Sequence, residues 1–103
     1  MQNILISTIN SWFRDKTDVY MMICGSWLGK PKDDWYSLVD VYFNENDLHV
    51  KLSEDWSLLL TGNISAREKN NTISLVCDSL ILQFPSGKIR KYTDNVEVDF
   101  FVD

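Results

Sequence analysis

Hydrophobic and polar residues alternate one by one from Val39 onward, which is the period of a β-strand with one buried face. The segment 37–52 predicts a β-hairpin around the turn 44–47, with Val39, Val41 and Phe43 facing the core. The register that puts the apolar side chains on one face pairs residues across the hairpin: Phe43 with Leu48, Asp40 with Lys51, and Tyr42 with His49.

Further short apolar runs predict the other strands. They cover residues 18–28 with a bulge at Gly25, 56–61, 72–77, 79–84, 88–93 and 96–102. The last two are expected to form a hairpin around Asp94-Asn95, in which Arg90 meets Asp99 and Tyr92 meets Glu97. The polar stretch 65–71 is expected to be a loop.

Residues 2–14 carry apolar side chains at helical spacing and predict an amphipathic helix. The fold class that follows is mostly β (α+β). About seven antiparallel strands would form a curled meander sheet or partial barrel with one N-terminal helix. A chain of 103 residues fits a single domain, 1–103.

The chain is acidic, with 15 Asp and Glu against 10 Lys and Arg and a net charge of −5. This balance excludes nucleic acid and an anionic membrane surface as partners, and it favours a basic protein. The start shows neither a basic region nor a cleavage site, so we expect no signal peptide and a cytoplasmic location. Cys24 and Cys77 lie in apolar runs and are expected to be buried free thiols.

Catalytic motifs are missing from the sequence. His49 is the single histidine, and its position predicts an exposed neighbour of Tyr42 on the hairpin. Neither metal-ligand spacing nor a glycine-rich phosphate loop is present. We therefore expect no enzyme, no metal and no cofactor.

One stretch gathers aromatic residues and acids at the outer ends of the hairpin. Because those ends lie side by side, the segments 33–36 and 54–56 should form one patch for a basic partner. The expected partner-binding residues are Asp33, Asp34, Trp35, Tyr36, Glu54, Asp55 and Trp56, with Glu45 and Asp47 as a second acidic cluster at the far hairpin end. The alternative is that the tryptophans cap the core and the acids form a solvated rim.

The chain resembles small bacterial immunity proteins, which neutralise the toxins of contact-dependent growth inhibition and related systems. The residues that carry the resemblance are Trp27, Gly29, Pro31, Asp33 and Asp34, followed by the hairpin positions Val39, Val41, Leu48 and Val50. The resemblance implies a cognate toxin as partner, often a cationic nuclease whose phosphate-binding cleft is occupied by acidic residues. A monomer is expected. A ligand-binding β-barrel, a structural subunit of a larger assembly and a phage-encoded nuclease inhibitor remain open as alternatives.

Overall fold

The computed structural model of the chain describes residues 3–27 and 35–102. Over that part, one helix, α1 (Asn3–Arg14), precedes an eight-stranded sheet. The strands are β1 (Asp18–Ile23), β2 (Ser26–Trp27), β3 (Tyr36–Asn44), β4 (Asp47–Leu52), β5 (Ser57–Thr61), β6 (Ser65–Lys69), β7 (Thr72–Gln83) and β8 (Ile89–Phe101), and the 3-10 turn η1 (Ser53–Asp55) joins β4 to β5. The predicted mostly-β class with an N-terminal helix is confirmed.

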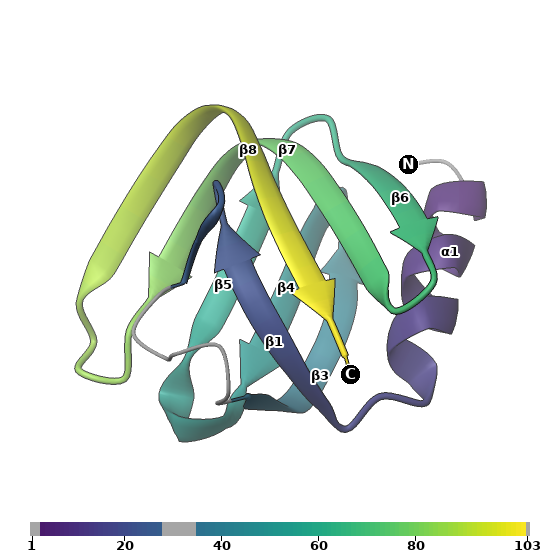
Figure 1. Cartoon of the computed structure of the whole chain (residues 1–103). Coiled ribbons are helices and arrows are strands. Elements are labelled where there is room, and N and C mark those ends of the chain that lie inside the picture. Colours follow the sequence, from purple (N-terminus) through teal and green to yellow (C-terminus); the bar gives the residue numbers. More distant parts are fainter. Residues whose placement is uncertain (1–2, 28–34, 103) are drawn as a thin grey trace.

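The sheet curls until it meets itself (Figure 1). Neighbouring strands follow the order β1, β3, β4, β5, β7, β8, and β8 pairs with β1 again. This closes a ring, although not a regular barrel, with β2 and β6 attached outside it. The contact between β1 and β3 has only two residue pairs, Asp18 with Ser37 and Val19 with Tyr36.

The hairpin of β3 and β4 has the predicted register: Phe43 pairs with Leu48, Asp40 with Lys51, and Tyr42 with His49. The expectation that Val39 faces the core is wrong, because Val39 is 66% exposed. A bulge between Leu38 and Asp40 shifts the alternation by one residue there. Leu38 therefore packs against the core in place of Val39.

The four short strands predicted at the C-terminal end form only two long strands in the structure, β7 and β8. These two strands pair along their whole length. The predicted hairpin 88–93/96–102 is wrong. Asp94 and Asn95 have positive φ (67° and 57°), but they lie opposite the single residue Asp78 and form a bulge. The chain reverses at 84–88 instead, where the Phe84 amide donates to the Lys88 carbonyl at 2.8 Å.

Two further expectations are corrected along the chain. The stretch 65–71, expected to be a loop, contains β6, which pairs with β7. The expected bulge at Gly25 is a two-residue turn, in which Cys24 and Gly25 have φ of 50° and 78°, so that Ser26 pairs back with Ile23. Because this turn leaves the Cys24 side chain exposed, the expectation that Cys24 is buried is wrong, whereas Cys77 is buried as expected.

The helix fills the ring at the side between β3 and β6, both of which it contacts. Its buried residues are Ile9, Trp12 and Phe13, which recur at helical spacing on one face. The Phe13 ring meets Phe100 of β8 edge to face, with centroids 5.2 Å apart. No charged side chain among residues 3–27 and 35–102 is buried, and no helix there has the length and apolarity to cross a membrane.

Candidate functional site

The outer ends of the β3–β4 hairpin lie together, as the sequence predicted. The Ser37 amide donates to Ser53 Oγ at 3.2 Å, and the rings of Tyr36 and Trp56 meet edge to face with centroids 5.5 Å apart. Asp33 and Asp34, the first half of the predicted patch, lie outside the described residues.

Two aromatic members of the predicted patch are core residues rather than contact residues. Tyr36 is 2% exposed and Trp56 is 6% exposed. Tyr36 pairs with Val19 where the ring closes, and Trp56 packs between Tyr36 and Phe84, whose ring centroid is 5.0 Å from its own. For these two residues the alternative interpretation, that aromatic side chains cap the core, is correct.

The acids of the second segment do reach the surface. Glu54 and Asp55 are exposed, and both have positive φ (62° and 65°), which turns the chain sharply between β4 and β5. They line an open groove of about 520 Å³, whose other walls include Lys51, Gln83 and Pro85. This groove is the part of the predicted patch that the described residues retain.

Trp35 is 50% exposed, and its ring packs on a different part of the fold. It meets Tyr20 of β1 edge to face, with centroids 6.3 Å apart, and Tyr20 stacks on Phe101 of β8 at 5.5 Å. We call Tyr20, Trp35 and Phe101 the aromatic cluster. Nothing in the sequence indicated that Phe101 and Trp35 share the neighbour Tyr20.

A pair of carboxylates lies next to this cluster on β8. Glu97 is exposed and Asp99 is half-buried, and they point to the same side of the strand. Protonated Glu97 donates a hydrogen bond to the Asp99 side chain, and this bond, together with repulsion between the two charges, raises the pKa of Glu97 above its ordinary value, while Arg67 acts in the opposite direction. The predicted cross-strand partners are wrong, since Asp99 pairs with Ser74 and Glu97 with Val76.

The second predicted acidic cluster lies at the far turn of the β3–β4 hairpin. Glu45 is exposed with φ of 59°, and Asp47 is half-buried and pairs with Asn44. Because the hairpin ends are separated by its length, Glu45 and Asp47 belong to a different surface from Glu54 and Asp55.

The single histidine has the neighbour that the sequence predicted. The His49 ring stacks on Tyr42, with centroids 4.7 Å apart and an angle of 3° between the planes, and Lys51 lies over the same Tyr42 ring at 5.8 Å. Within the described ranges 3–27 and 35–102, no three His, Cys, Asp or Glu side chains form a group that could hold a metal ion.

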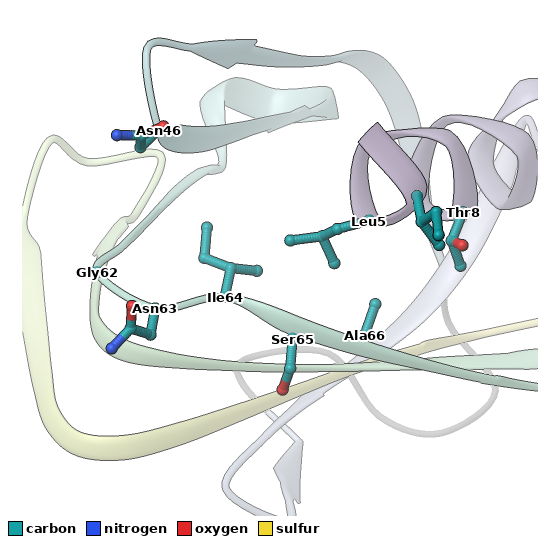
Figure 2. A pocket seen from close by; sticks show the side chains of 9 residues that line it. Leu5, Thr8, Asn46, Gly62, Asn63, Ile64, Ser65 and Ala66 are labelled. Atoms are coloured by element: carbon teal, nitrogen blue, oxygen red, sulfur yellow. The ribbon is translucent and has the colours of Figure 1, made fainter. Parts of the chain in front are cut away.

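A surface hollow of about 570 Å³ separates the first turns of α1 from β6 (Figure 2). Leu5 of the helix and Ile64 point toward one another across it, and Ala66 forms its floor. The ring interior itself is filled by buried side chains such as Leu60 and Val98. This packing gives no support to the alternative of a barrel with an internal ligand site.

No protein-family model matches the chain, and neither a curated protein nor a solved structure matches it. The functional argument therefore rests on the surface chemistry described above.

Proposed function

We propose that this protein is an immunity protein that binds and inhibits a cognate basic toxin, a nuclease domain. The observation that carries the proposal is the combination of a net charge of −5 with a half-exposed tryptophan on a fold whose described charges all lie at the surface. Acidic surfaces attract cationic partners over a distance, and tryptophan contributes strongly at interfaces.

The physical basis of inhibition is competition for the toxin's cationic surface. A nuclease holds its substrate through Lys and Arg that contact phosphates. Carboxylates such as Glu54 and Asp55, exposed beside an open groove, present negative oxygen atoms to the same cations. A protein bound in this way excludes the nucleic acid without performing chemistry of its own.

Co-expression tests the proposal. The toxin domain encoded by the reading frame immediately upstream of this protein's gene is expressed in a bacterial host, alone and together with this protein. We expect arrested growth with the toxin alone and normal growth with both proteins. A domain that is harmless alone, or that remains equally toxic in the presence of this protein, would contradict the proposal.

A further inference from the structure

Four strands, β1, β8, β7 and β6, lie side by side on one face of the molecule, with α1 beyond β6 (Figure 1). Their registers place one row of residues across all four strands: Met22, Asp99, Ser74 and Arg67. Residues directly opposite each other in antiparallel strands point to the same side, so this row faces outward together. We call the surface around this row the outer face.

The charges on the outer face are separated. Glu97 and Asp99 lie on β8, whereas Arg67 lies on β6, two strands away from Asp99. At the usual strand spacing this separates the Arg67 and Asp99 backbones by about 9–10 Å. The short side chain of Ser74 fills the position between them. Consequently, the two acids repel each other, and Arg67 offsets that repulsion only at a distance.

One carboxylate oxygen of Asp99 has no hydrogen-bond partner. This oxygen, Oδ1, is buried, although the side chain as a whole is only half-buried. A carboxylate oxygen that is removed from water without a donor is unfavourable by an amount comparable to a lost hydrogen bond. Arg67 therefore offsets the charge of the pair only in part, and Asp99 Oδ1 lacks a hydrogen-bond donor.

The aromatic cluster borders the same acids. Phe101 follows Asp99 two residues along β8, on the same side of the strand, and Tyr20 of β1 pairs with it. The half-exposed Trp35 ring lies against Tyr20. The half-exposed Trp35 ring near two carboxylates suits a cation that is also planar, because arginine both stacks on rings and binds carboxylates through a fork of donors.

We infer that the outer face is the docking surface for the protein partner, and that the partner places an arginine side chain on Glu97 and Asp99 beside the aromatic cluster. This inference rests on the proposed function in that the partner is basic. Charge complementarity supports the position: the guanidinium would supply donors and positive charge to the exposed Glu97 carboxylate and to the exposed part of Asp99. Arg67 would direct the basic segment toward β8 and away from β6, because like charges repel.

A peptide titration tests the surface without the toxin. Isotope-labelled protein is titrated with acetyl-Gly-Arg-Gly-amide, and backbone amide signals are followed by NMR. We expect saturable shifts at Met22, Ser74, Glu97 and Asp99, with weaker binding of the lysine analogue because it lacks the fork. The Glu97→Gln/Asp99→Asn variant should lose these shifts. Asp15→Asn/Asp94→Asn removes the same charge at two exposed positions elsewhere and should keep them, and thermal unfolding shows whether each variant is folded.

Two outcomes of the titration overturn the inference: shifts that centre on other residues, or equal binding by the Glu97→Gln/Asp99→Asn protein. The co-expression assay links the surface to the toxin. Charge reversal by Glu97→Lys/Asp99→Lys should abolish protection, and full protection by this folded variant overturns the inference while leaving the proposed function intact. If the parent protein gives no protection, the proposed function fails, and the peptide titration still decides whether the outer face binds arginine.

Discussion

The rings of Tyr36 and Trp56 meet edge to face inside the protein, with centroids 5.5 Å apart, although Trp56 directly follows two exposed acids in a turn. The contact ties the start of β3 to the start of β5 and lies beneath the exposed acids Glu54 and Asp55. Tyr36 and Trp56 therefore support the surface from below, and Trp35 is the aromatic residue of these segments that a partner can reach.

This distinction predicts that substituting the two tryptophans lowers the free energy of unfolding by different amounts. Trp56→Ala should lower the free energy of unfolding by about 3–5 kcal/mol, because it leaves a cavity beside Tyr36 and Phe84. Trp35→Ala should lower it by less, because half of the Trp35 side chain is exposed, and should weaken toxin binding. Urea unfolding measures the free energy of unfolding of both variants. An equal loss of stability in the two would contradict the assignment of Trp56 to the core and Trp35 to the surface.

Gly62 is predicted to be the least replaceable of the described glycines. It has φ of 88°, and a Cβ there would overlap the side chain of Asp78, which accepts a hydrogen bond from the Asn63 amide at 2.9 Å. Gly62→Ala should therefore strain the backbone and displace the Asp78 side chain from the Asn63 amide. We expect the free energy of unfolding to fall by about 2 kcal/mol or more.

Gly25→Ala is the matched control, because Gly25 has φ of 78° but no neighbouring atom within 4 Å of the added Cβ. It should incur only the backbone strain, about 1 kcal/mol. If thermal unfolding shows equal effects for both substitutions, the close approach of Asp78 to Gly62 is not what constrains this turn.

The two thiols should react very differently. Burial raises the pKa of Cys77 to about 11, so almost none of it is thiolate at pH 8, whereas Cys24 is exposed. In folded protein, iodoacetamide should modify Cys24 rapidly and Cys77 only after denaturation. Mass spectrometry of the Cys24→Ser variant provides the check, since rapid modification of that folded variant would show that Cys77 is accessible.

The acid pair on β8 predicts a pH dependence of stability. The hydrogen bond with Asp99 raises the pKa of Glu97 above its ordinary value of 4.5, so the native state holds this proton more tightly than the unfolded chain does. The resulting stabilisation is present below the ordinary pKa and is lost as the pH rises through the raised one. Arg67 opposes this effect but does not reverse it.

Glu97→Gln keeps a hydrogen-bond donor at every pH and removes the repulsion. The variant should therefore gain stability relative to the parent between pH 4 and pH 7, which unfolding curves at both values would show. A difference that stays constant with pH would mean that Glu97 and Asp99 do not share a proton in the folded protein.

Local pairing could be predicted from the sequence, and long-range pairing could not. The stack of Tyr42 on His49 follows from alternation on both sides of one short turn, because only one register puts the apolar residues next to the turn on one face. Asp94 and Asn95 favour positive φ equally in a hairpin turn and in a bulge. Pairing of β8 with β7 decides between the turn and the bulge, and the local sequence pattern around Asp94 and Asn95 does not contain this pairing.

The surroundings of Glu97 and Asp99 could likewise be predicted only in part from the sequence. The outward direction of Glu97 and Asp99 could be predicted from strand alternation, but the position of β1 and β6 relative to them depends on how the ring closes. The strand β6 was not recognised in the sequence because Ala66 is its single apolar residue, and an edge strand needs little apolar surface.

Titration of the toxin's own activity tests the central claim most directly. The purified toxin domain cleaves nucleic acid while increasing amounts of this protein are added, at low and at high salt. We predict that activity falls linearly to zero at one equivalent of this protein at low salt, and that inhibition weakens at high salt because the attraction is electrostatic. Undiminished cleavage in the presence of excess folded protein would contradict the account.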